Sequence, residues 1–464
     1  MKTRVIQDDS DDPTAFEDRA EAPVEQKRST NLAARIARWS AHHRKKAVFG
    51  VGRSDRVDET PPNSSERRNT MTRPAPHPKL TRGRRKLALS GAILAGLIAA
   101  VLLAASAIAT TATTNSTSAP QLQEDLDALV AAGVPGAILV VRDGSHTVSI
   151  ASGLGNVDEQ TPMRPGDRFR IASHTKTYVA TVVLQLVSEG KLHLEDTVEQ
   201  WLPGLVPNGD GITIRQLLNH TSGLFDYEND PRVFEPYING DLTYHWAPRE
   251  LVRIAVSHEP LFEPGATQSY SNTGYILAGL IIKAATENTL RGELRSRIFQ
   301  PLQMRATSFP TRPGIAGRHA HGYIILGEPS AIDLTGISPF VWAAGAIIST
   351  GADDLSFYRA LLSGRLLRAG LLREMKEVVP IEGAPPGAGY GLGLTRYGTT
   401  CGIAWGHDGA FGGFYSEAFT SENGRHQALL MVNLDETSQT EDFKSLFDEL
   451  LDKAYCSTFR SPNR

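Results

Sequence analysis

Cysteine is scarce in this chain of 464 residues: Cys401 and Cys456 are its two cysteines, and both lie in the last quarter. No CxxC pair or regular Cys/His spacing is present, which argues against a structural zinc site. In an oxidising compartment, two cysteines far apart in sequence predict one disulfide bond, and two free, buried thiols are the alternative.

Positive charge is also scarce over most of the chain. Residues 1–86 hold 20 Lys and Arg against 12 Asp and Glu, whereas residues 87–464 hold 28 against 39. Phosphate backbones are bound by clustered positive charge, so the acidic larger part argues against nucleic acid as a partner.

Large apolar residues are rare in residues 1–70, which are rich in Arg, Asp and Ser. Such a segment buries too little surface to offset the entropy of ordering. We therefore expect residues 1–86 to form a disordered, basic tail on the cytoplasmic side. A true start at Met71 instead of Met1 is an alternative explanation of the first part of this tail.

Charge is absent from residues 87–109, which are almost entirely apolar. At 1.5 Å per residue this run is long enough to cross the ~30 Å hydrocarbon core of a bilayer. Four basic residues stand just before it, which places the N-terminus inside and the remainder outside the cell membrane. The segment predicts a single-pass anchor, and a cleaved signal peptide that yields a secreted protein is the alternative. Residues 110–119 form a Ser/Thr-rich linker.

The remaining chain, 120–456, predicts an α+β domain followed by a flexible tail over 457–464. Asp143-Gly144 and Asn423-Gly424 each stand between two apolar runs, as in tight β-hairpins. Residues from about 170 to 380 are mostly helical in pattern. We therefore expect an antiparallel sheet built from both chain ends and flanked by helices, with a mostly helical subdomain inserted between them.

The first motif that can carry chemistry is Ser173-His174-Thr175-Lys176, at the expected start of a helix. Positions i and i+3 share a helix face, so the Lys176 amine can reach the Ser173 hydroxyl. A serine becomes a good nucleophile when a neighbouring group takes its proton, and free N–H groups at a helix start can bind an oxyanion. On its own, the motif is more typical of a capping serine with an exposed lysine.

Two further motifs follow along the chain. Tyr270-Ser271-Asn272 lies in a loop framed by Gly and Pro, where Tyr270 can relay a proton and Asn272 can bind an amide. His407-Asp408-Gly409 follows an expected strand over 402–406, where His407 can donate a hydrogen bond and carry partial positive charge. Taken singly, each motif is more typical of a structural turn or a buried histidine.

Together, S-x-x-K, Y-S-N and H-x-G in this order resemble the serine β-lactamase and penicillin-binding family, in the branch of class C β-lactamases and D-alanyl-D-alanine carboxypeptidases. The resemblance covers about residues 120–456, the expected serine hydrolase domain. Further matching stretches are Phe169–Ala172, Leu217–Gly223, Ala344–Thr350 and Tyr390–Leu394.

The resemblance implies an acyl-enzyme formed on Ser173, with proton handling shared by Lys176 and Tyr270. It leaves open which of the two is the acylation base. The backbone N–H groups of Ser173 and Ala410 would bind the oxyanion, and Asn272 would hold the substrate amide. Gly409 would leave room for substrate, and no metal or organic cofactor is implied. Phe340 or Trp342 would form an apolar wall, with a core role as the alternative.

The substrate is less securely implied, because Asp408 and Ala410 stand where the carboxypeptidases commonly carry threonines that bind a terminal carboxylate. A carboxylate at 408 would repel that group unless strand alternation turns it away. We expect a carboxypeptidase-like enzyme acting on small peptides such as peptidoglycan stems. The alternatives are an esterase or amidase of the same fold, and a sensor that binds penicillin or wall peptides without turnover.

Overall fold

The computed structural model describes residues 119–459, apart from 326–330, 386 and 436–437. The predicted tail and hydrophobic segment, 1–86 and 87–109, lie outside the described residues, as does the linker up to residue 118. No helix in the described part is both long and apolar enough to cross a membrane.

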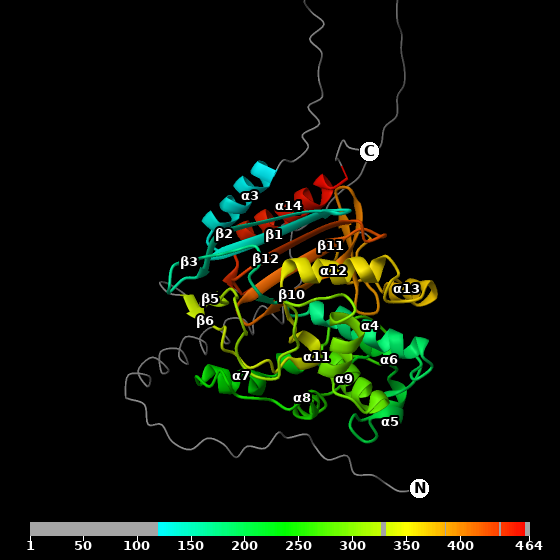
Figure 1. The fold of residues 1–464 in the computed structure, drawn as a ribbon. Coiled ribbons are helices and arrows are strands. Elements are labelled where there is room, and N and C mark those ends of the chain that lie inside the picture. Colours follow the sequence, from blue (N-terminus) through cyan, green and yellow to red (C-terminus); the bar gives the residue numbers. More distant parts are fainter. Residues whose placement is uncertain (1–118, 326–330, 386, 436–437, 460–464) are drawn as a thin grey trace, which may run out of the picture. The chain divides into compact units, whose positions relative to one another are not determined.

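Within the described residues, one large antiparallel sheet is built from the two ends of the domain, as the sequence predicts (Figure 1). Its eight strands run in the order β3-β2-β1-β12-β11-β10-β9-β8. The strands are β1 (Gly136–Asp143), β2 (His146–Asn156), β3 (Thr161–Pro162), β8 (Gly389–Tyr390), β9 (Thr395–Thr399), β10 (Gly402–Phe411), β11 (Phe414–Thr420) and β12 (His426–Val432).

Both predicted hairpins are present in this sheet. Gly144 has a φ of 60° between β1 and β2, and Gly424 has a φ of 73° between β11 and β12. Glycine adopts these left-handed conformations without the steric cost that a Cβ would add. The pairing of β1 with β12 then joins the first and last parts of the domain, with Val140 opposite Leu429.

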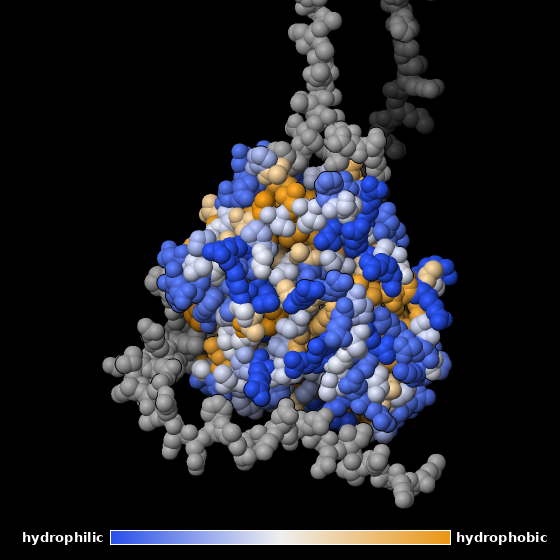
Figure 2. Space-filling model, viewed as in Figure 1, coloured by the Kyte–Doolittle hydropathy of each residue, from blue (hydrophilic) through white to orange (hydrophobic). Residues whose placement is uncertain are grey.

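Helices cover the two faces of the sheet (Figure 1). The outer face is covered by α3 (Ala119–Ala131) and α14 (Glu441–Ser457), whose leucines and phenylalanines pack on the outward side chains of β1, β11 and β12. The inner face is covered by α4 (His174–Ser188) and α12 (Gly351–Leu362). An orange strip between α3 and α14 in Figure 2 marks apolar side chains where the two helices meet.

The segment between β4 and β8 is mostly helical, which confirms the predicted insertion. Two small antiparallel pairs lie within or beside it: β4 (Phe169–Arg170) with β7 (Ile348–Ser349), and β5 (Tyr323–Ile325) with β6 (Ala331–Asp333). Its other helices are α5 (Val198–Trp201), α6 (Ile214–Leu218), α7 (Pro231–Ile238), α8 (Pro248–Ala255), α9 (Asn272–Thr286), α10 (Leu290–Leu294), α11 (Trp342–Gly345) and α13 (Ala369–Met375).

Candidate active site

Ser173 lies immediately before α4, at a sharp turn out of β4. Ala172 has a φ of 47°, in the left-handed region that is costly for a residue with a side chain. The first amides of α4 donate to carbonyl oxygens of the turn before it: His174 N to Ile171 O at 3.2 Å, and Thr175 N to Ala172 O at 2.9 Å. The amide of Ser173 itself has no partner among the described residues, so it is the backbone donor that remains beside the nucleophile.

The amine of Lys176 contacts three oxygen atoms at the base of the site. Nζ lies 3.0 Å from Ser173 Oγ, 2.7 Å from Asn272 Oδ1 and 2.8 Å from the carbonyl oxygen of Ala344. The Asn272 amide is held in this orientation because its Nδ2 donates to Asp226 at 3.0 Å. The predicted bond from Asn272 to substrate has only the second N–H of this amide left for it.

Burial lowers the pKa of Lys176 to about 8, although the carboxylates of Glu228, Asp226 and Asp408 act in the opposite direction. A neutral amine has two N–H bonds and one lone pair. The carbonyl oxygens of Asn272 and Ala344 can only accept, so they take both N–H bonds. The lone pair then faces the Ser173 hydroxyl, which is the geometry of a general base.

The phenol of Tyr270 completes the surroundings of the nucleophile by donating to Ser173 Oγ at 2.9 Å. Loss of water around its hydroxyl, followed by the charge of Asp408, raises the pKa of Tyr270 well above its ordinary value. Tyr270 is therefore a phenol and a proton donor at neutral pH. Of the two candidate bases, Lys176 has the pKa suited to taking the proton from Ser173.

His407 lies within β10, which continues to Phe411 instead of ending at residue 406 as predicted. The ring centroids of His407 and Tyr270 are 6.5 Å apart, so the two predicted groups share one site. Burial lowers the pKa of His407 to about 4, and the ring is neutral at pH 7. The partial positive charge expected from the sequence is therefore not available.

The strand carrying His407 has an open edge at the site, because β9 pairs with it only as far as Gly406. A Cβ at Gly409 would come within 2.9 Å of Ser173 N and 2.5 Å of Ile171 O. The backbone of β10 thus touches the turn that carries the nucleophile. Ala410 is the next residue of β10 and lies opposite Tyr415 of β11, and its role in binding an oxyanion stays a prediction.

Asp408 is turned by strand alternation to the face of the sheet that α14 covers, away from His407 and Ser173. Its carboxylate is 50 % exposed, and Oδ1 lies 3.7 Å from His407 Nδ1. It is the cross-strand partner of Glu417 and accepts a bond of 3.4 Å from Tyr397. Its negative charge still acts on Lys176 and Tyr270, although its carboxylate does not face Ser173.

Two acidic residues below Lys176 were missed by sequence reasoning. Burial raises the pKa of Asp226, and burial together with Asp226 raises the pKa of Glu228 to about 7. Both lie in the loop after the Leu217–Gly223 stretch, where no periodicity or motif marks them. What the sequence offers is their position directly after Leu217–Gly223, a stretch that resembles the family.

His220 is a further residue that the sequence did not assign to the site. Its ring lies 4.3 Å from that of Tyr270 and 4.5 Å from that of Tyr390, and its Nδ1 accepts from the amide of Ser271. Burial lowers the pKa of His220 well below its usual value. The neutral His220 ring therefore packs against the Tyr270 ring and helps to hold it in position.

Of the two candidates for the apolar wall, Phe340 takes the alternative role in the core. Phe340 is buried and stacks on Tyr237 with ring centroids 4.8 Å apart, so it belongs to the core. Trp342 packs on α9, where a Cβ at Gly279 would meet its ring at 2.7 Å. Trp342 is half-buried, and its role as an apolar wall of the site stays a prediction.

The predicted disulfide is present. Cys401 and Cys456 are bonded with their Cα atoms 5.6 Å apart, across 55 positions of sequence. The bond connects the β9–β10 turn to α14 on the outer face of the sheet. It lies at the other end of β10 from Gly409 and Ala410.

Comparison with known proteins agrees with this geometry. The model of the family described as Beta-lactamase matches residues 122–451. A D-stereospecific amidohydrolase from Streptomyces sp. is 39% identical, with a TM-score of 0.65 over 70% of this chain and 96% of that one. The D-amino acid amidase of Ochrobactrum anthropi SV3 is 32% identical, with a TM-score of 0.65 over 73% and 98%.

Curated relatives match over a shorter part. Penicillin-binding protein 4* of Bacillus subtilis is 31% identical over 194 residues, which are 41% of this chain and 42% of that protein. Protein flp of Staphylococcus aureus is 30% identical over 232 residues, and the match spans 45% of its length. The family match over most of the chain, on a fold that joins Ser173, Lys176 and Tyr270, shows that this protein belongs to the Beta-lactamase family of serine hydrolases.

Proposed function

We propose that this protein is a serine amidase that hydrolyses amides of D-amino acids carrying a free amino group and no carboxylate at the cleaved end. The observation that carries the proposal is the charge around the nucleophile. His407 is neutral, and the charge of Asp408 acts on Lys176 and Tyr270 from the other face of β10. A substrate carboxylate would find no cation on His407 and would be repelled by the charge of Asp408 across the strand.

The proposed acylation begins with attack of Ser173 Oγ on the amide carbon. Lys176 Nζ takes the hydroxyl proton through the 3.0 Å contact. The oxyanion accepts from the backbone N–H groups of Ser173 and Ala410. Tyr270 donates a proton to the leaving nitrogen and is reprotonated from Lys176, so the amine leaves neutral. Water then attacks the ester carbon, which releases the acid and restores the Ser173 hydroxyl.

The same charges favour a substrate with an ammonium group. Asp226, Glu228 and Asp408 all act on Lys176 through their negative charge, so the potential in the site is negative. A protonated α-amino group is attracted by such a potential. The preference for D-configured substrates rests on the two solved relatives, which are a D-stereospecific amidohydrolase and a D-amino acid amidase.

A second candidate is a D-alanyl-D-alanine carboxypeptidase acting on peptidoglycan stems. It is supported by the 31% identity to penicillin-binding protein 4* and by a histidine in the H-x-G motif. A sensor that becomes acylated without turnover is the third. These candidates share the acyl-enzyme and differ in which acyl donor is hydrolysed and whether the adduct is released.

The deciding experiment compares substrates on the purified protein. We expect faster hydrolysis of D-alaninamide than of L-alaninamide, N-acetyl-D-alaninamide, a peptide ending in D-Ala-D-Ala, or nitrocefin. Faster release of D-alanine from the peptide would establish the carboxypeptidase instead, and a stable adduct with a fluorescent penicillin but no turnover would establish the sensor.

Ser173→Ala is the matched test of the nucleophile, with the exposed Ser363→Ala as its control. We expect Ser173→Ala to lose turnover and labelling by a fluorophosphonate while the control keeps both. Labelling that survives in Ser173→Ala would rule out the assigned nucleophile.

We also propose that the domain is exported and held at the cell membrane through residues 87–109, with a secreted form as the alternative. The apolar run and the basic residues before it support this topology. Protease treatment of intact cells should remove the hydrolase domain, and its full protection would contradict export.

A further inference from the structure

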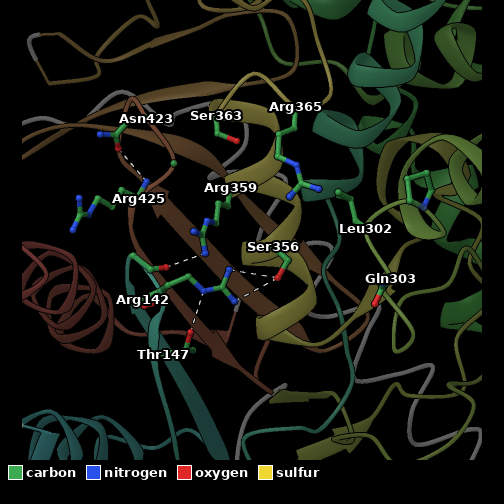
Figure 3. Close-up of a pocket in the computed structure, with 14 residues that line it drawn as sticks. Arg142, Thr147, Leu302, Gln303, Ser356, Arg359, Ser363, Arg365, Asn423 and Arg425 are labelled. Carbon is green, nitrogen blue, oxygen red and sulfur yellow. Dashed lines mark hydrogen bonds between the residues drawn. The ribbon is translucent and has the colours of Figure 1, made fainter.

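A hollow of about 890 Å³ lies away from the active site, at the tips of the β1–β2 and β11–β12 hairpins (Figure 3). Four arginines line it, Arg142, Arg359, Arg365 and Arg425. Its volume is within the range of about 300–1,000 Å³ that is common for small-molecule sites. Among the described residues that line the hollow, none is acidic, although the domain as a whole is acidic.

Arg142 is the buried member of this group, with only 9 % of its surface exposed. Its guanidinium donates to the neutral oxygens of Thr147 and Ser356, at 3.1 and 3.4 Å. A buried charge is ordinarily paired with an opposite one. Within the described chain, Arg142 has no carboxylate within ion-pair distance.

A second guanidinium faces the first. Arg359 extends from α12 toward Arg142 in Figure 3 and donates to the carbonyl oxygen of Gly144 at 2.9 Å. Burial lowers the pKa of Arg142, and the positive charge of Arg359 lowers it further. Both side chains still carry their charge at neutral pH, because arginine does not lose its proton in proteins. Two like charges are therefore held together without a counterion.

The other two arginines add charge at the mouth of the hollow. Arg365 is exposed, and its side chain has no partner among the described residues. Arg425 turns its guanidinium outward in Figure 3 and lies 3.8 Å from Asp143. Asp143 also lies 3.3 Å from His426, and its single negative charge leaves the four arginines with a net positive charge.

The hollow is separate from the catalytic groups. In the sheet, Arg142 on β1 is three strands from His407 on β10, roughly 14 Å at about 4.8 Å per strand. Ligands can therefore occupy the two places independently. Among the described residues that line the hollow there is no histidine, cysteine, lysine or carboxylate to activate its serine hydroxyls, so we assign it binding alone.

We propose that this hollow is a binding site for a phosphate-bearing anion. Guanidinium groups match phosphate oxygens in charge and in paired hydrogen-bond geometry. The hydroxyl groups of Ser356 and Thr147, already turned to Arg142, complete a polar lining. A single phosphate group contacts one or two guanidinium groups. Three or four guanidinium groups therefore suit a ligand that carries more than one phosphate group. Both a soluble polyphosphate and a phospholipid headgroup carry this chemistry.

The test uses the purified full chain and two probes, at about 0.15 M salt to suppress long-range attraction. Pyrophosphate binding is measured by calorimetry. Binding to phosphatidylcholine vesicles, with and without phosphatidylglycerol, is measured by sedimentation. The variant is Arg359→Gln with Arg365→Gln, and the matched control is Arg368→Gln, an exposed arginine that does not line the hollow. Arg365→Gln alone serves if the double variant fails to fold.

We expect the double variant to weaken binding of at least one probe about tenfold or more, with Arg368→Gln unchanged. Loss of pyrophosphate binding would identify a soluble ligand. Loss of the preference for phosphatidylglycerol vesicles alone would identify a lipid headgroup. The proposal is overturned if both probes bind the double variant and the control equally well, or if neither probe binds the unaltered protein.

Discussion

The hydroxyl of Tyr390 lies 2.8 Å from Nε2 of His407, while Nδ1 of the same ring lies 2.5 Å from the carbonyl oxygen of Asp408. A carbonyl oxygen only accepts, so Nδ1 carries the proton and Nε2 accepts from Tyr390. Both ring nitrogens are thus satisfied in the neutral form. The arrangement explains why the histidine of the H-x-G motif supplies no charge to a substrate.

The first prediction concerns the titration of His407, whose pKa is lowered to about 4 by burial. The unfolded chain binds this proton near pH 6.5, so stability is lost as pH falls from about 6.5 to 4, by roughly 3 kcal/mol at most. Imidazole nitrogen NMR should show a neutral ring down to about pH 5. A charged ring at pH 6 would contradict the assigned hydrogen bonds.

The second prediction concerns the pH dependence of acylation. With Lys176 as the base and its pKa at about 8, kcat/KM should rise with pH and level off above this value. Removing the negative charge of Glu228 destabilises the protonated form of Lys176. Glu228→Gln should therefore move the midpoint down by roughly 1 unit.

Glu235→Gln, an exposed change on α7, is the control for this shift and should leave the midpoint in place. A profile that is flat between pH 6.5 and 9, or that moves equally in both variants, would exclude Lys176 as the titrating base.

The third prediction concerns the substrate carboxylate. Replacing Asp408 with threonine removes about 1 kcal/mol of repulsion and should raise kcat/KM for a peptide ending in D-Ala-D-Ala roughly fivefold. Release of D-alanine is the measurement, and Asp210→Asn, a distant exposed carboxylate, is the control. No gain in Asp408→Thr would count against repulsion as the reason for substrate choice.

The fourth prediction concerns the approach of β10 to the nucleophile. In Gly409→Ala, the new methyl group would meet the Ser173 amide at 2.9 Å and displace an oxyanion donor. We expect kcat to fall about 100-fold or more. Gly370→Ala places the same methyl group in open space on α13 and should leave kcat unchanged. Equal activity of the two variants would show that this amide does not bind the oxyanion.

The fifth prediction concerns the disulfide. Replacing Cys401 and Cys456 with serine removes a cross-link over 55 positions and should lower the free energy of unfolding by about 2–4 kcal/mol. Denaturant unfolding of both forms without reductant gives this difference. Since the bond is at the far end of β10, kcat should be retained. A variant as stable as the parent would mean that the disulfide hardly restricts the unfolded chain.

Much of the fold could be predicted because local signals agree with the final structure. The turn dipeptides at Gly144 and Gly424 set two hairpins, and the spacing of Ser173 and Lys176 set one helix face. Three sequence motifs then identified the reacting groups. The 3.0 Å contact between Lys176 Nζ and Ser173 Oγ follows from the i, i+3 geometry of a helix start.

Other features depend on contacts between distant segments and have no local signal. Asp226 enters the site through its bond to Asn272, and His220 through its stacking on Tyr270. The neutral state of His407 depends on burial beneath other elements.

The two helices of the outer face lie side by side, with Lys453 of α14 bonded to Asp125 of α3 at 2.5 Å (Figure 1). Both ends of the described domain therefore leave from the side of the sheet opposite Ser173. A fluorophore, an affinity tag or a surface linkage joined at either end would leave the catalytic opening unobstructed. The domain can thus be immobilised through Ala119 without losing access for substrate.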